Sequence, residues 1–268
     1  ASPEVSGGRE DAPITWSALG ALSAVPGEDD HLYAAPDNSL DPSRIYTIDT
    51  TTQGDGGPAQ ITDQLFLRKD GEAVGYDVEG LWADEDGTFW LAVEGEESDD
   101  GGAEGNLLVH VDEDGAVTDE VEMPEEVAAG LGDQGFEGVT GYGSGDDAVL
   151  YAAVQRPSSE DPEDVARIGR YTVATGEWEW FGYELESTDT EGDWIGLSEI
   201  TAVDEDTLAV IERDKLNGPD AALKSVYTVD VPDGDVSAEA GGSLPVLDTT
   251  LAVDVLPHLQ GMNGWTQE

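Results

Sequence analysis

Acidic side chains recur at matching places along this sequence, next to short apolar segments. Asp37, Glu94 and Glu212 follow such segments, and a further set of acids precedes others. The members of that second set are Asp77, Glu79, Glu137 and Glu199. Carboxylates suit Ca²⁺, which takes roughly six to eight oxygen ligands in flexible geometry. If the fold brings these acids together, they could hold Ca²⁺, and a metal-activated water could then hydrolyse an ester.

Basic residues are scarce, and most of them fall in four long predicted loops. The chain has only 10 Lys and Arg. Those in or beside the loops are Arg44, Arg156, Arg167, Arg170, Arg213, Lys215 and Lys224. Arg156 and Arg213 take equivalent positions, directly after Gln155 and Glu212, and guanidinium groups bind phosphate and carboxylate through paired hydrogen bonds. We therefore expect Arg156, Arg213, Lys215 and Gln155 to bind substrate. The alternative is that each Arg pairs with a nearby Glu for structural reasons.

An internal repeat predicts how these residues are positioned. Four segments share an apolar strand, an acidic turn and a second apolar strand, and they align on Leu22, Leu81, Val139 and Ile200. A third alternating segment follows each of them, as in Ile45-YTID, and then a less regular fourth. Four antiparallel strands repeated about every sixty residues are typical of a propeller blade. The sequence predicts an all-β fold, a β-propeller of four-stranded antiparallel blades.

The repeat also predicts the domain organisation. We expect a flexible N-terminal tail over residues 1–13 and a single propeller domain over 14–268. Its repeats are approximately 14–70, 71–130, 131–190 and 191–257, with a remnant at 258–268. Two alternatives stay open for ring closure at the C-terminus: the chain is a portion of a longer protein, or the ring closes with few blades. An unpaired sheet edge there could associate with a second copy of the chain.

Blade topology predicts one shared face for the acids and arginines. In an antiparallel blade, the start of strand one, the end of strand two and the start of strand three lie on the same side. The loops near 36–44, 94–106, 155–170 and 212–224 should therefore converge. Long loops on a rigid scaffold commonly carry binding residues.

The charge balance excludes several classes of partner. With 61 Asp and Glu, the formal net charge is −51. Nucleic acid and anionic membrane surfaces attract Lys and Arg, so neither is an expected partner. No segment is long and apolar enough for membrane insertion. Salt shortens the Debye length from about 10 Å at 0.1 M to about 3 Å at 1 M. Screening would relieve carboxylate repulsion, so we expect adaptation to high salt.

Other chemistry finds little support in the sequence. Cysteine is absent, which excludes disulfides and thiolate chemistry. The three histidines, His31, His110 and His258, have no partner at a spacing typical of a metal pair, and Gly143-Ser144-Gly145 lacks the spaced glycines of a nucleophile elbow. Water activated on a metal is therefore the favoured hydrolytic mechanism.

Several of these segments resemble one protein family. The runs Asp77-VEGLWADEDGTFWLAVEGE, Gly135-FEGVTGYGSGDDAVLYAAVQRP and Gly196-LSEITAVDEDTLAVIERD are similar to segments of the family described as having esterase-like activity of phytase. The opening run Leu19-GALSAVPGEDDHLYAAPD is also similar, and the resemblance covers about residues 15–232. The family's closing Glu-Gly strand and terminal Asp-Asn-Asp segment, expected beyond Gly264, do not occur.

The resemblance implies a secreted or envelope-associated β-propeller that hydrolyses phosphoesters or other esters. Ala1 in place of Met fits an export signal already removed. Carried over by position, the resemblance favours the candidates already named and adds Asp214. The assigned site residues are these: catalytic Glu79, Glu137, Glu199 and Glu212; substrate-binding Arg156, Arg213, Lys215 and Gln155; metal-binding Asp37, Asp77, Glu94 and Asp214.

The expected function is a metal-assisted hydrolase with Ca²⁺ as cofactor and a small anionic or ester substrate. Two alternatives stay open from the sequence. One is a non-catalytic propeller that binds a small molecule or protein at the face where the long loops converge. The other is a lactonase-like propeller with one central metal and a carbohydrate-derived substrate.

Overall fold

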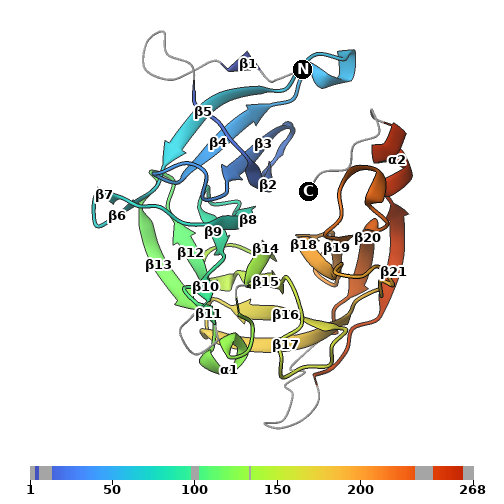
Figure 1. Cartoon of the computed structure of the whole chain (residues 1–268). Coiled ribbons are helices and arrows are strands. Elements are labelled where there is room, and N and C mark those ends of the chain that lie inside the picture. Colours follow the sequence, from blue (N-terminus) through green and yellow to red (C-terminus); the bar gives the residue numbers. More distant parts are fainter. Residues whose placement is uncertain (1–3, 6–13, 98–102, 133, 233–243, 262–268) are drawn as a thin grey trace.

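A computed structural model of the chain describes residues 4–5, 14–97, 103–132, 134–232 and 244–261. Four antiparallel sheets are arranged radially, each with one strand toward the centre of a ring (Figure 1). The predicted class, an all-β propeller of four-stranded blades, is confirmed. Of residues 1–13, predicted as a tail, only 4–5 are described, and they form β1 (Glu4–Val5), which pairs in parallel with the outer strand of the first blade.

The strands follow the predicted repeat, and each blade runs from the innermost to the outermost strand in chain order. Blade 1 comprises β2 (Leu19–Val25), β3 (Glu28–Pro36), β4 (Arg44–Asp49) and β5 (Gln60–Phe66). Blade 2 comprises β8 (Val78–Ala83), β9 (Phe89–Val93), β12 (Leu107–Val111) and β13 (Val117–Glu122). Blade 3 comprises β14 (Phe136–Tyr142), β15 (Val149–Val154), β16 (Val165–Thr172) and β17 (Glu177–Glu184). Blade 4 comprises β18 (Ile195–Ala202), β19 (Thr207–Asp214), β20 (Lys224–Asp230) and β21 (Thr249–Asp254).

Several short strands and helices lie outside the four-stranded blades. Two short ribbons are formed by β6 (Arg68–Lys69) with β7 (Glu72–Ala73) and by β10 (Glu96–Glu97) with β11 (Ala103–Glu104). The α-helices among the described residues are α1 (Glu125–Ala128) and α2 (Leu256–Gly261), and the short 3-10 helices are η1 (Gln53–Asp55), η2 (Gly145–Asp147) and η3 (Gly218–Asp220). None of the helices in the described part of the chain has the length and apolar character needed to cross a membrane. Of the predicted remnant 258–268, residues 258–261 belong to α2, and the rest lie outside the described residues.

Most of the hydrophobic clusters lie between neighbouring blades, and a further cluster is formed by blade 1 with Ile14. Separate clusters of buried side chains fill the spaces between blades 1 and 2, 2 and 3, and 3 and 4. Strands β14 and β15 are covered on both faces, and nearly all of their residues are buried. The tryptophans of blades 2 and 3, Trp82, Trp90, Trp178 and Trp180, belong to the cluster between those blades. The spacing of sheets around the ring therefore follows from side-chain packing.

The inner strands approach one another closely because of glycine. A Cβ atom on Gly80 would lie 2.5 Å from the Val139 backbone nitrogen, and one on Gly138 would lie 2.9 Å from the Ile200 nitrogen. No other residue fits such a backbone approach. Strands β2, β8, β14 and β18 pack in that order, whereas among the described residues no comparable packing joins β18 to β2 (Figure 1).

Candidate functional site

A β-bulge at the same position in every inner strand begins the site. The pairing register slips between Leu19 and Ala21, and it slips at the equivalent place in β8, β14 and β18. The extra residues are Gly20, Glu79, Glu137 and Ser198. Bulges re-aim side chains and are common beside active sites. In blades 2 and 3, the re-aimed residue is a glutamate.

The central feature of the site is a group of three carboxylates on blade 2. Asp77, Glu79 and Glu94 each offer an oxygen, and these oxygens lie within 4.8 Å of one another. Asp77 precedes β8 and Glu94 follows β9, and the Glu94 nitrogen donates to the Asp77 carbonyl at 2.9 Å. The pairing of β8 with β9 thus places them side by side. We call Asp77, Glu79 and Glu94 the acidic cluster.

Neighbouring loops hold the acidic cluster in position. Asp77 accepts hydrogen bonds from Asn38 through its backbone nitrogen at 3.1 Å and through its side-chain amide at 2.7 Å. Glu94 accepts a bond from the Gly135 nitrogen at 3.1 Å, which links blade 2 to blade 3. These bonds fix two of the three carboxylates before any ligand binds.

Asp37, Glu137 and Glu199 extend the acidic region around the ring. A Cβ on Gly20 would lie 3.4 Å from Glu79 Oε2 and 3.6 Å from the Asp37 Cβ, so the missing side chain makes room for both acids. Glu137 is 6% exposed and accepts a hydrogen bond from the Gln155 amide. Glu199 accepts a bond from the Ile200 nitrogen at 2.9 Å. Acids far apart in the sequence are therefore brought together.

Burial and mutual repulsion disfavour the charged forms of two of these acids. Burial raises the pKa of Glu79 to about 9, and the charges of Glu137, Asp77, Glu94 and Asp37 add to the effect. Burial also raises the pKa of Glu199 well above its ordinary value, and the charge of Glu137 contributes. A bound cation would reverse this preference, because an opposite charge nearby stabilises a carboxylate.

Two predicted site residues make other contacts. Glu212 is 1% exposed and accepts hydrogen bonds from the Tyr183 hydroxyl at 2.8 Å and the Glu186 nitrogen at 2.7 Å. Asp214 is fully buried and pairs with Lys224, whose Nζ lies 3.0 Å from Oδ1. These contacts stabilise blades 3 and 4. The functional roles predicted for Glu212 and Asp214 stay predictions.

Several of the Lys and Arg residues predicted in or beside the four long loops also have structural partners. Arg44 donates to the Pro42 carbonyl and stacks on Phe66, and Arg167 forms an ion pair with Asp161. Arg170, which lies within β16, forms an ion pair with Glu179 of β17. Lys215 is exposed, and its backbone nitrogen donates to Asp193 at 3.2 Å. The structural alternative therefore describes Arg167, Arg170 and Lys224 well.

Arg156 and Arg213 meet at a single tryptophan. The Cζ atoms of Arg156 and Arg213 lie 4.9 and 4.6 Å from the centroid of the Trp194 ring. Gly196 permits this arrangement, because a Cβ there would lie 3.0 Å from the indole. Trp194 was not among the site residues predicted from the sequence. The feature that could have identified it is its position just before β18, on the same face of the propeller as the two arginines.

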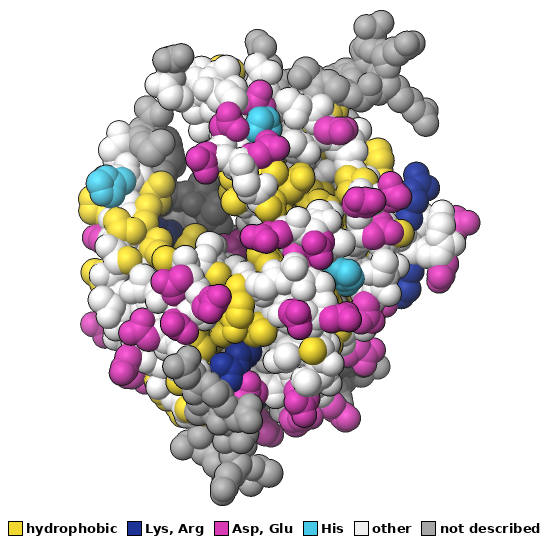
Figure 2. Space-filling view, turned by 180° about the vertical axis from the view of Figure 1, so that it is seen from behind, with side chains coloured by type: hydrophobic (Ala, Val, Ile, Leu, Met, Phe, Trp, Pro, Cys, Tyr) yellow, Lys and Arg dark blue, Asp and Glu magenta, His cyan; other side chains and the backbone are white. Residues whose placement is uncertain are grey.

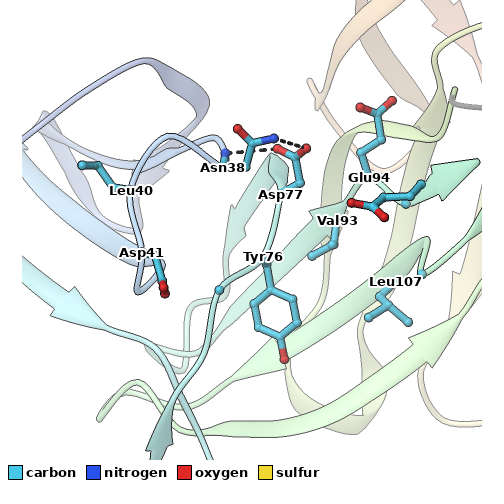
Figure 3. Close-up of a pocket in the computed structure, with 12 residues that line it drawn as sticks. Asn38, Leu40, Asp41, Tyr76, Asp77, Val93, Glu94 and Leu107 are labelled. Atoms are coloured by element: carbon cyan, nitrogen blue, oxygen red, sulfur yellow. Dashed lines mark hydrogen bonds between the residues drawn. The ribbon is translucent and has the colours of Figure 1, made fainter.

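A pocket adjoins the acidic cluster between blades 1 and 2. Its volume is about 580 Å³, within the range of small-molecule sites. Asp77 and Glu94 of the acidic cluster are among its lining residues, together with Tyr76 and Leu107 (Figure 3). A substrate in this pocket would have a reactive group within reach of the carboxylates.

Comparisons with known proteins point to one family. The model of a phytase-like family, described as esterase-like activity of phytase, matches residues 14–268. No curated protein is similar enough to match. Among solved structures, an oxidoreductase of Thermus thermophilus described as a glucose dehydrogenase has 12% identity and a TM-score of 0.41, covering 91% of this chain and 75% of that one. The alpha-L-arabinanase of Cellvibrio cellulosa has 14% identity and a TM-score of 0.41, covering 82% and 74%.

Proposed function

The chain belongs to the phytase-like family described as having esterase-like activity of phytase, and we propose on that premise that it is a metal-assisted hydrolase of esters, phosphoesters included. The observation that carries this proposal is the acidic cluster. Three carboxylate oxygens within 4.8 Å of one another repel each other strongly unless a proton or a cation intervenes. Burial is the main cause of the raised pKa of Glu79, and the neighbouring carboxylates add to it.

The donor set fits Ca²⁺. All the candidate ligands are carboxylate oxygens, which suit hard cations. Asp77, Glu79 and Glu94 would hold the ion, and Asp37 and Glu137 would lie at its edge. Bound there, Ca²⁺ would polarise the ester oxygen and lower the pKa of a water molecule.

Residues outside the acidic cluster would transfer protons and orient the substrate. Burial raises the pKa of Glu199 well above its ordinary value and so favours the protonated form, which is suited to protonate a leaving alcohol. Glu137, oriented by Gln155, is suited to accept a proton from water. Arg156 and Arg213, stacked against Trp194, would orient the reacting group through charge-assisted hydrogen bonds.

Hydrolysis assays before and after chelation test this function. The protein is purified without chelator and assayed on a carboxylic ester and a phosphomonoester, then treated with chelator and resupplied with Ca²⁺. We expect activity that is lost on chelation and restored by Ca²⁺, and a Glu79→Gln variant that is inactive. Glu113→Gln, an exposed acid in the β12–β13 turn, is the matched control and should keep full activity. Turnover of neither ester by the Ca²⁺-loaded protein would favour the non-catalytic alternative.

The surface charge supports a working environment of high salt. Figure 2 shows acidic side chains spread over one whole face of the molecule, with few basic ones among them. At a net charge of −51, self-repulsion destabilises the compact state unless salt screens it. An exported or envelope-associated protein would experience the salt of its surroundings directly.

A further inference from the structure

The pocket beside the acidic cluster has an apolar wall that is held rigidly. Leu40, Tyr76, Val93 and Leu107 contribute the apolar part of its lining. Tyr76 is fixed at both ends: its hydroxyl donates to Glu120 Oε1 at 2.6 Å, and its backbone nitrogen donates to Ser43 Oγ at 2.7 Å. Such a wall is suited to an organic group of several carbon atoms.

All the charged side chains that line the pocket are acidic. Four acidic residues line the pocket: Asp41, Asp77, Glu94 and Glu96. No Lys or Arg is among its lining residues in the described part of the chain. Figure 3 shows carboxylates on both sides of the space, from the loop after β3 and from the end of β9. An anion placed there would be repelled by these groups and by the net charge of the chain.

We infer that this pocket binds the cationic organic group of an ester substrate, an ammonium-bearing acyl or alcohol group. The carboxylates attract the ammonium charge, and the apolar wall with the Tyr76 ring accommodates its alkyl substituents, as aromatic faces do for quaternary ammonium groups. The ester group then lies beside Asp77 and Glu94. Only this last step rests on the proposed function. Substrates that carry several phosphates are disfavoured in the pocket.

Binding of three matched probes tests the inference without catalysis. Butyltrimethylammonium, butanol and butyl phosphate share the same alkyl chain and differ in charge. Their affinities are measured by calorimetry or NMR on the full chain at constant ionic strength after chelation, so that no Ca²⁺ is present to bind the phosphate. We expect butyltrimethylammonium to bind at least about tenfold more tightly than butyl phosphate, in a 1:1 ratio. Equal affinities, or tighter binding of butyl phosphate, would overturn the inference.

Two variants locate the binding in this pocket. Leu107→Trp fills the space and should abolish butyltrimethylammonium binding. The double variant Asp41→Asn with Glu96→Gln removes charge from exposed positions and should weaken it about threefold or more while leaving butanol binding unchanged. Glu113→Gln should bind like the parent protein. Binding that survives Leu107→Trp in a folded protein, and is insensitive to the double variant, would assign the cation to another site.

The outcomes for the pocket and for the enzymatic function are separable. A protein that binds the cationic probe in a Leu107-dependent manner but hydrolyses no ester retains the pocket and contradicts the function. A protein that hydrolyses esters with Ca²⁺ but binds the cationic probe no better than butyl phosphate retains the function and contradicts the pocket.

Discussion

Gly138 and the carboxylate of Glu199 lie in direct contact across the interface of two inner strands. A Cβ atom on Gly138 would lie 2.6 Å from Glu199 Oε1 and 2.9 Å from the Ile200 nitrogen. Glu199 takes the position in β18 that Gly80 and Gly138 take in β8 and β14. The carboxylate therefore occupies space that the preceding blade leaves open.

Replacing Gly138 with Ala should displace Glu199 and separate the inner strands. Because one of the close atoms is backbone, relief requires a shift of β18, and we expect a loss of about 1–3 kcal/mol in the free energy of unfolding. Denaturant unfolding measures it. Gly54→Ala is the matched control, because a Cβ there would meet nothing within 4 Å and its effect should stay within about 0.5 kcal/mol. Equal stability of the two variants would contradict the observed contact.

The pKa of Glu79 predicts how the metal-free protein responds to pH. The folded state binds the Glu79 proton more tightly than the unfolded state does, since folding raises this pKa from 4.5 to about 9. Stability therefore decreases as the pH rises between those values. Thermal unfolding of chelator-treated protein should show this decrease, and Glu79→Gln should reduce it. A metal-free protein that gains stability over that range, with no change in slope in the variant, would contradict the assignment.

Trp194 is expected to position the two arginines rather than touch the reacting atoms. Trp194→Leu removes the ring against which both guanidinium groups stack, each contact contributing about 0.5–1 kcal/mol. We expect KM for the hydrolysed ester to rise about tenfold with kcat little changed. Trp194→Phe retains an aromatic face and should recover most of the affinity. A drop in kcat alone would argue against a positioning role.

The acidic surface predicts a large dependence of stability on salt. Melting temperature should rise from about 0.1 M to about 1 M NaCl as the Debye length falls from about 10 to about 3 Å. Sucrose at matched osmolality is the control for non-ionic effects. A melting temperature that stays constant with NaCl would contradict adaptation to high salt.

The architecture could be predicted from the sequence because local residue patterns mark the strands and turns of each repeat. Alternating apolar residues and acidic turns recur in all four units, and the pairing of β8 with β9 alone places Asp77 beside Glu94. The convergence of Glu79 and Glu137 was expected from topology, but its cause, the bulge shared by the inner strands, leaves no mark in a single sequence.

Roles that depend on side-chain partners could not be predicted. Glu212 and Arg213 are adjacent in β19, yet Glu212 accepts hydrogen bonds from Tyr183 and Glu186 whereas Arg213 stacks on Trp194. Neighbouring residues in a strand point to opposite faces, so their side chains meet different partners. The pocket beside the acidic cluster was also missed, since its lining comes from separate segments of two blades.

Calorimetric titration of the chelator-treated protein with Ca²⁺ measures metal binding by the acidic cluster without any substrate. We predict saturable binding at the cluster that is lost in the Asp77→Asn, Glu79→Gln double variant and preserved in Glu113→Gln. Absence of saturable Ca²⁺ binding, or binding of equal affinity in the double variant, would contradict it.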